Sequence, residues 1–180
     1  MKGFLREALI VVFFAAVIYL LLQFVIQGVP VIGSSMEPNL ASSGQRVLIS
    51  PAAYWFQSPQ RGDIITFNPP ESWPNPKKLP FIKRVIGLPG ETIEIRQGRV
   101  FIDGAETPLD EPYVEKTFTY SVPEIEIPAD SYFVLGDNRN ISEDSHLYGV
   151  ILRKSIIGKA WLSYWPPSLW GLVPSYSYAD

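Results

Sequence analysis

The chain has 180 residues, which accommodates one domain or one domain with a small insertion. It is 47% hydrophobic and 18% charged, and its net charge of -3 comes without a basic patch, so nucleic-acid binding has no electrostatic support. There is no cysteine, and His146 is the one histidine. These counts exclude disulfides, thiol catalysis, cysteine-ligated zinc and multi-histidine metal sites.

The first predicted element is a membrane anchor. Ala8–Ile26 is uncharged, and Gln23 interrupts its apolar run. As a helix at ~1.5 Å per residue it spans roughly 28 Å, close to the ~30 Å hydrocarbon core of a bilayer. It is longer than the core of a cleaved signal peptide and lacks the polar stripe of a soluble helix. We therefore predict a short N-terminal stretch over 1–7, a transmembrane anchor over 8–27 and a main domain over 28–180.

The flanking charges predict the orientation of this anchor. Lys2 and Arg6 precede it, whereas no positive charge follows until Arg46. By the positive-inside rule the N-terminus lies in the cytoplasm and the main domain lies outside.

The main domain has the pattern of a β-rich fold. Short apolar or alternating runs are separated by turn residues, and Gln97-Gly98 is typical of a hairpin turn. The predicted strands are Gln45–Ser50, Asp63–Phe67, Phe81–Gly87, Glu91–Arg96, Arg99–Asp103, Ser131–Gly136 and Val150–Tyr164. A small insert at about 105–130 is predicted to hold two more, Thr117–Val122 and Glu124–Ile127. The expected fold is mainly β, a closed or partly closed β structure on a single helix.

The segment Val31–Leu40 follows the predicted anchor and contains Ser34 and Ser35 after a glycine. Such a run is ordinarily a flexible linker. A hydrolase, in contrast, needs a hydroxyl on a fixed turn, a nearby base and donors for the developing oxyanion. Taken alone, the segment favours the linker, and the rest of the chain must supply the base and the donors.

Lys83 lies inside a largely apolar predicted strand, where alternation puts it on the same face as Phe81 and Val85. A lysine in this place is either an edge charge that discourages strand aggregation or a base. In the second case apolar neighbours lower the pKa of the ammonium, and the neutral amine accepts a proton from a serine.

The polar run Gly136–Gly149 follows an apolar strand. Its Asn, Asp, Ser and Gly residues are typical of a solvated loop. The same residue types also orient neighbouring groups through hydrogen bonds.

These three segments, in this order, resemble the signature boxes of the type I signal peptidases, the peptidase S26 family. The first resembles Ser-Met-x-Pro, with Ser35 as the serine, and the second resembles Lys-Arg-x-x-Gly-x-Pro-Gly, with Lys83 as the lysine. The third resembles Gly-Asp-Asn-Arg-x-x-Ser-x-Asp-Ser, with Ser142 and Asp144 in the supporting positions. Arg61–Phe67 resembles the strand box between the first two. Four motifs in one order after an N-terminal anchor form a specific signal.

The resemblance implies a membrane-bound serine endopeptidase that removes N-terminal signal peptides from exported preproteins, without a metal or cofactor. Ser35 would attack the scissile carbonyl, and Lys83 would take its proton. Ser142 would hydrogen-bond the lysine, and Asp144 and Arg84 would hold the framework.

The resemblance also implies shallow pockets that select the Ala-x-Ala ending of signal peptides by excluding larger side chains. The matching apolar residues are Val31, Met36, Leu40, Phe81 and Ile82. The backbone N–H of Ser35 would donate to the oxyanion. Some family members carry a serine hydroxyl two residues before the nucleophile, but this chain has Gly33 there. His146 stands where arginine is common and is expected to be a structural loop residue.

Three other interpretations remain open. A Ser-His-Asp triad would use His146, which is close in sequence to Asp144. A membrane-anchored, peptide-binding β-domain would have no catalysis. A self-cleaving Ser-Lys repressor protease shares the chemistry, but the anchor and the lack of a DNA-binding segment disfavour it.

The anchor also predicts where the chemistry occurs. Ser35 lies about nine residues beyond Ile26, so it is within roughly 32 Å of the end of the anchor. We expect the lipid bilayer and the signal peptides of preproteins as partners, no nucleic acid, and a protein that acts as a monomer. The expected location is the plasma (inner) membrane, with the thylakoid membrane as the alternative.

Overall fold

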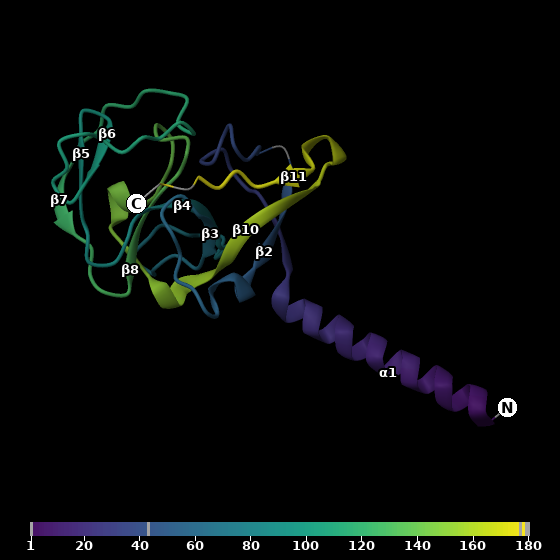
Figure 1. The fold of residues 1–180 in the computed structure, drawn as a ribbon. Helices are drawn as coiled ribbons and strands as arrows, with labels where there is room; N and C mark the ends of the chain where they lie inside the picture. The colour runs from purple at the N-terminus through teal and green to yellow at the C-terminus, as the bar shows by residue number, and fades with distance from the viewer. Residues whose placement is uncertain (1, 43, 177, 179–180) are drawn as a thin grey trace.

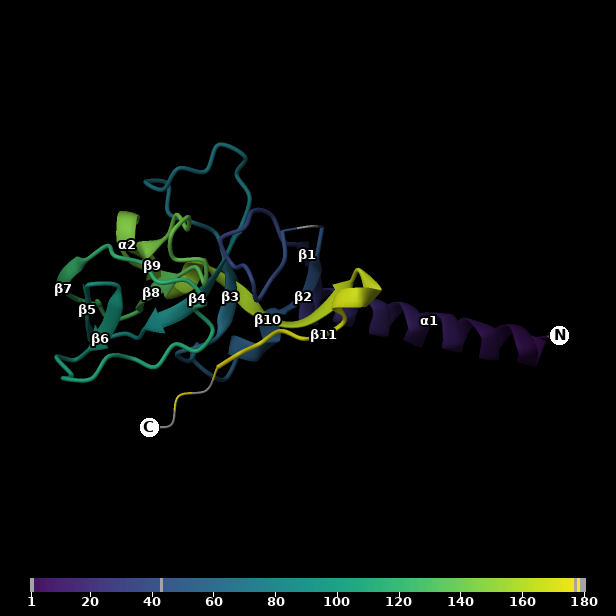
Figure 2. The same cartoon turned by 90° about the horizontal axis from the view of Figure 1, so that it is seen from above.

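The computed structural model describes the backbone of residues 2–42, 44–176 and 178, and their side chains except at 2, 5 and 20–24. It consists of one long helix, α1, and two β-sheets (Figure 1). Figures 1 and 2 show that α1 projects away from the sheets and meets them at its C-terminal end. The β part therefore contains every motif discussed above.

Helix α1 covers Lys2–Val25, the region of the predicted anchor. The side chains of residues 20–24, within that anchor, and of Lys2, used to orient it, lie outside the described residues. Among the residues that the structure does describe, no helix combines the length and the apolar character needed to cross a membrane. The transmembrane anchor over 8–27 and its orientation therefore stay predictions.

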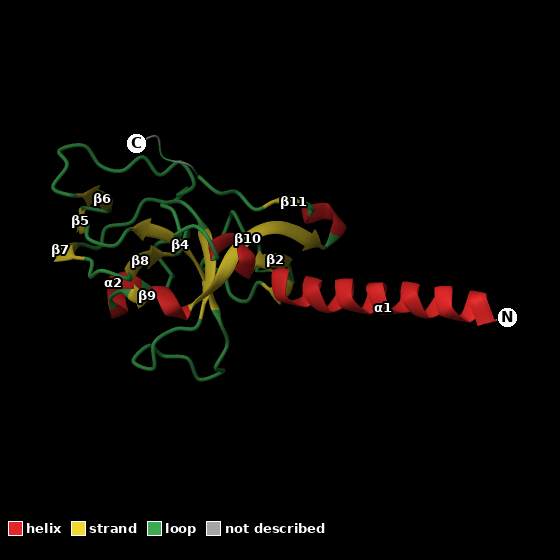
Figure 3. Ribbon diagram, turned by 60° about the horizontal axis from the view of Figure 1, so that its bottom comes forward, coloured by secondary structure: helices red, strands yellow, loops and turns green. Residues whose placement is uncertain are grey.

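The main sheet has the strand order β1-β2-β10-β3-β4-β8-β9, with β11 against β10, and all its paired strands are antiparallel. Figure 3 colours the strands of both sheets yellow. The strands are β1 (Gln27–Pro30), β2 (Arg46–Ser50), β3 (Ile64–Phe67), β4 (Phe81–Gly87), β8 (Ser131–Leu135), β9 (Ile151–Leu152), β10 (Ile156–Trp165) and β11 (Gly171–Leu172). Short helical turns are η1 (Pro51–Tyr54), α2 (Ser145–Tyr148), η2 (Arg153–Ser155) and η3 (Pro167–Leu169). Strand β4 is an inner strand, so the lysine motif lies in the middle of the sheet.

A second sheet has the order β6-β5-β7, with β5 at Thr92–Arg96, β6 at Arg99–Ile102 and β7 at Val122–Glu126. The hairpin between β5 and β6 turns at Gln97 and Gly98, both of which have positive φ angles, 48° and 72°. Positive φ at both central residues is what a type I′ turn requires. A Cβ at Gly98 would also clash with the carbonyl of Phe118. The predicted hairpin is confirmed.

The mainly β fold is confirmed, but the strands differ from the prediction, and β1 and β11 were not predicted. The predicted strand Val150–Tyr164 is divided into β9 and β10 by the turn η2. The insert contains β7 alone among its described residues, so the separate strand Thr117–Val122 was wrong. Phe118 is buried in the hydrophobic cluster of the small sheet, so this segment is held by side-chain packing and not by strand pairing.

The alternation of β4 between two faces is also confirmed. Phe81 and Val85 pack into one hydrophobic cluster, whereas Ile82 and Ile86 pack into two others. Lys83 shares the face of Phe81 and Val85. The strand thus places a lysine where its neighbours are apolar.

We predict that Ile64→Ala lowers the free energy of unfolding by about 2–4 kcal/mol, because it leaves a cavity in the core. Ile64 is fully buried in the cluster that supports residues 31–40. Urea denaturation followed by tryptophan fluorescence measures the loss. Leu172→Ala is the matched control, since Leu172 is 77% exposed and its truncation is expected to cost less than ~0.5 kcal/mol. Equal losses in the two variants would contradict this packing.

Candidate active site

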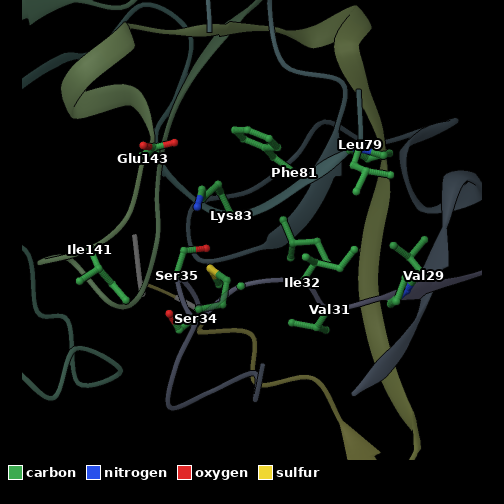
Figure 4. A pocket seen from close by; sticks show the side chains of 15 residues that line it. Val29, Val31, Ile32, Ser34, Ser35, Leu79, Phe81, Lys83, Ile141 and Glu143 are labelled. Atoms are coloured by element: carbon green, nitrogen blue, oxygen red, sulfur yellow. The ribbon is translucent and has the colours of Figure 1, made fainter. Parts of the chain in front are cut away.

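The serine and lysine of the first two motifs line one cavity of about 390 Å³ (Figure 4). The cavity lies between the chain that runs from β1 into the serine loop and the chain that leads into β4. Its lining residues are Val29, Pro30, Val31, Ile32, Gly33, Ser34, Ser35, Met36, Leu79, Pro80, Phe81, Ile82, Lys83, Ile141 and Glu143. The lining is largely apolar, so polar groups inside it are few and specifically placed, as in most small ligand sites.

The loop that carries Ser35 is anchored and not a flexible linker. Val31, Met36 and Leu40 are each less than 5% exposed and pack into one hydrophobic cluster. The Val31 N–H donates to the carbonyl of Gln45 at 2.8 Å, and the Leu40 N–H donates to the carbonyl of Met36 at 2.8 Å. These contacts on both sides of Ser35 fix the turn on which its hydroxyl lies.

The third motif holds the backbone of this loop. The Asn138 N–H donates to the Ser35 carbonyl at 3.0 Å, and Nδ2 of Asn138 donates to the Ser34 carbonyl at 3.2 Å. A Cβ at Gly136 would clash with Ser142 and with the Ser35 carbonyl, so glycine permits the close approach. Sequence reasoning did not assign these roles to Gly136 and Asn138, although both belong to the third motif.

Lys83 is 4% exposed and pairs with Ile65 of β3 through the backbone. Its Nζ lies 5.9 Å from the centroid of the Phe81 ring. Burial lowers the pKa of this ammonium to about 8, while the charges of Asp144, Glu143 and Asp137 act in the opposite direction. Lys83 takes part in no ion pair with the described residues. A neutral amine is therefore accessible to it near physiological pH.

The supporting residues of the third motif are all buried. Oδ2 of Asp144 accepts the Gly136 N–H at 2.8 Å, and Oδ1 accepts the His146 N–H at 3.1 Å. Ser142 is 3% exposed, and its Oγ has no hydrogen-bond partner among the described residues. The hydrogen bond from Ser142 to Lys83 that the resemblance implies is thus not formed in this structure.

Arg84 lies beside Lys83 in β4 and takes part in a buried ion pair. Its Nε and Nη2 donate to the two carboxylate oxygens of Asp137 at 2.8 and 2.7 Å, and both side chains are 1% exposed. Asn39, four residues after the serine, donates to the same carboxylate at 2.9 Å. This network connects β4, the third motif and the serine loop. Removing one partner of such a buried ion pair destabilises the protein, because the other charge is left buried without a partner.

Four of the five residues expected to form the substrate pocket lie in the cavity wall. Val31, Met36, Phe81 and Ile82 line the cavity. Leu40 does not line it: this residue is 1% exposed and belongs to the core cluster beneath the loop.

His146 is also absent from the lining of the cavity. Its Nδ1 lies 2.7 Å from Oδ1 of Asp144, and its ring stacks on Tyr120 with a centroid separation of 4.1 Å. Within the described residues no cluster of His, Cys, Asp and Glu is arranged to hold a metal ion.

A serine hydroxyl and a buried lysine in one apolar cavity are the groups that a serine–lysine hydrolase uses. Comparison with protein families specifies the class further. The family described as Signal peptidase, peptidase S26, matches residues 4–165. The chain belongs to this family.

Individual relatives agree with the family. A probable signal peptidase I-1 of Synechocystis sp. is 40% identical over 179 residues, covering 97% of this chain and 90% of that protein. A signal peptidase I of Leptolyngbya laminosa is 46% identical over 148 residues, covering 80% of this chain and 71% of that protein. The chloroplastic thylakoidal processing peptidase 1 of Arabidopsis thaliana is 34% identical over 141 residues, covering 75% and 41%. The resemblance inferred from the four motifs is confirmed.

We predict that kcat/KM for peptide cleavage rises with pH through an apparent pKa of about 8, because a neutral Lys83 amine is required. Below that value the activity should fall about tenfold per pH unit. Steady-state kinetics on a peptide without titratable side chains measures the profile, and circular dichroism at each pH controls for unfolding. An apparent pKa near ~6.5, typical of histidine, or near ~10.4, typical of exposed lysine, would contradict the assignment.

We predict that Lys83→Met raises the free energy of unfolding at pH 7 by about 1–3 kcal/mol while it abolishes cleavage. The folded-state pKa of Lys83 is lowered from 10.5 to about 8. The unfolded chain therefore binds more protons between these values, so the wild type gains stability as pH rises across this window.

The advantage of Lys83→Met should accordingly shrink as pH rises from 8 toward 10.5. Chemical denaturation at several pH values measures it. Lys154→Met, at an exposed lysine, is the control and should change stability by less than ~0.5 kcal/mol. A Lys83→Met variant that is less stable than the wild type at pH 7 would contradict the desolvation of this lysine.

Proposed function

We propose that this signal peptidase, a serine endopeptidase that removes signal peptides, uses Ser35 as its nucleophile and Lys83 as its general base. The observation that supports this most is the burial of Lys83 in the cavity that also exposes Ser35. Burial lowers the pKa of the ammonium to about 8, so that a larger fraction of the lysine is a neutral amine able to accept a proton near neutral pH.

In the first half of the reaction the neutral amine of Lys83 takes the proton of Ser35 as Oγ attacks the scissile carbonyl. The backbone N–H of Ser35 donates to the oxyanion of the tetrahedral intermediate. Collapse of the intermediate breaks the C–N bond, and the ammonium of Lys83 gives its proton to the leaving amine of the mature protein. In the second half Lys83 takes a proton from water, which attacks the acyl-enzyme. The C–Oγ bond to Ser35 then breaks, the ammonium of Lys83 returns its proton to Oγ, and the signal peptide leaves with a free carboxylate.

The edge of β4 next to the cavity favours an extended substrate. Residues 81–83 pair with β3 on one side, whereas pairing with β8 begins at Arg84. An extended peptide could therefore add to the remaining edge, as in other complexes formed by strand addition. The neighbouring wall contains Val31, Met36 and Ile82. This bulky apolar wall leaves room for small side chains, which agrees with an Ala-x-Ala ending before the cut.

We also propose that the enzyme works at the surface of a lipid bilayer, with residues 8–27 as its anchor. Large apolar side chains are exposed at Trp55, Phe56 and Trp170, by 60%, 95% and 69%. Tryptophan and other aromatics of this kind are enriched where proteins meet a membrane interface. The plasma membrane is the proposed location, and the relative named as a thylakoidal peptidase supports the thylakoid as the alternative.

The rival interpretations differ in the variants that they predict to be inactive. We predict that Ser35→Ala and Lys83→Ala lower the cleavage rate of a preprotein at least ~10³-fold, as loss of a nucleophile or base does. His146→Ala should stay within ~10-fold of the wild type, because His146 does not line the cavity. Cleavage by the detergent-solubilised enzyme, with the cut mapped by mass spectrometry, measures these rates.

A Lys83→Ala enzyme that retains activity while His146→Ala loses it would show a histidine triad. Turnover that is absent in the wild type and unchanged in Ser35→Ala would show a peptide-binding domain without catalysis.

A further inference from the structure

Glu143 brings a carboxylate into the catalytic cavity. The lining contains four side chains with polar ends, on Ser34, Ser35, Lys83 and Glu143, and Glu143 is the acidic one. When Lys83 is neutral and ready to act as a base, Glu143 carries the net charge of the cavity lining. A charge in a largely apolar cavity acts on a bound peptide more strongly than one on an open surface.

The backbone position of Glu143 is fixed by the two residues on either side of it. Ser142 and Asp144 are buried, at 3% and 0% exposed, and Asp144 accepts hydrogen bonds from two backbone N–H groups. Glu143 itself is exposed, and within the described part of the chain its carboxylate forms no hydrogen bond or ion pair. The carboxylate is thus presented to the cavity and is available to a substrate.

The arrangement of the side chains around Ser35 indicates which part of a substrate would meet Glu143 (Figure 4). Glu143 and Ile141 lie on one side of Ser35, and Val29 and Leu79 lie on the other side. The apolar side is the one proposed to hold the small side chains before the cut. Because the peptide crosses the nucleophile at the scissile bond, the residues after the cut extend toward Glu143.

We propose that Glu143 is a specificity-determining residue on the leaving-group side of the scissile bond. It favours substrates with a basic side chain in the first residues of the mature protein and disfavours substrates with an acidic one. This inference rests on the proposed function, since it assumes that Ser35 is the point of attack.

Three peptides that differ only in the residue after the cut, which is Lys, Gln or Glu, test the proposal. The wild-type enzyme should cleave them in the order Lys, Gln, Glu, with a ratio of kcat/KM between the Lys and Glu peptides of about tenfold at low salt. In Glu143→Gln the ratio should approach one. Raising the salt concentration toward 1 M, where the Debye length is ~3 Å, should reduce the wild-type ratio. Glu124→Gln, an exposed acidic position in β7 away from the cavity lining, is the control and should keep the wild-type ratio.

A second readout separates a direct charge effect from a disturbed loop. The Glu143 carboxylate raises the pKa of Lys83, so its removal should move the acidic limb of kcat/KM for the Gln peptide to lower pH. Glu124→Gln should leave this limb in place. A misfolded loop would lower the rate at all pH values without moving the limb.

The possible failures are distinguishable. If the wild type cleaves none of the three peptides, the proposed function falls and this inference falls with it. If the wild type cleaves all three equally well, or if Glu143→Gln keeps the full preference, the proposed function stands and the role of Glu143 is overturned.

Discussion

The desolvation of one ammonium group is the constraint on which the rest of the structure depends. Lys83 is placed in an inner strand and is 4% exposed, and this burial lowers its pKa to about 8. A charged lysine in such a place destabilises the fold at neutral pH. The cost is tolerated because β4 is fixed by pairing with β3 and by apolar packing on both faces. The same burial that costs stability supplies the neutral amine that the proposed reaction needs.

A second network keeps the serine opposite this lysine. The ion pair of Arg84 with Asp137 lies beside Lys83 in the chain, and Asn39 joins it to the serine loop. The C-terminal segment contributes as well, because the carbonyl of Pro174 accepts a hydrogen bond from Arg84 at 3.0 Å. This contact gives the end of the chain a structural role that its proline- and aromatic-rich composition did not indicate. These polar contacts thus connect the strand of Lys83 with the loop of Ser35, the two groups proposed to react.

Sequence patterns predicted those parts of the fold that short-range residue order determines. Alternating residues located most of the strands, and the face of β4 that carries Lys83 followed from the same period of two. The four motifs identified the family, as the match over residues 4–165 confirms. Three features depended on tertiary contacts and were missed or wrong: Leu40 packs into the core, Phe118 is held by packing where a strand was expected, and Gly136 provides close approach to the serine loop. None of these leaves a periodic signal, because each is decided by residues distant in the sequence.

The central claim is that Lys83 is neutral in a substantial fraction of molecules at the pH of the reaction. Its side-chain nitrogen and adjacent methylene can be followed by NMR across a pH titration and assigned by their absence in Lys83→Met. We expect a titration midpoint at about 8 for this one lysine, lowered from the ordinary value of 10.5. A midpoint at the ordinary value would contradict it, because almost all of the lysine would then be protonated at neutral pH and could not take the proton of Ser35.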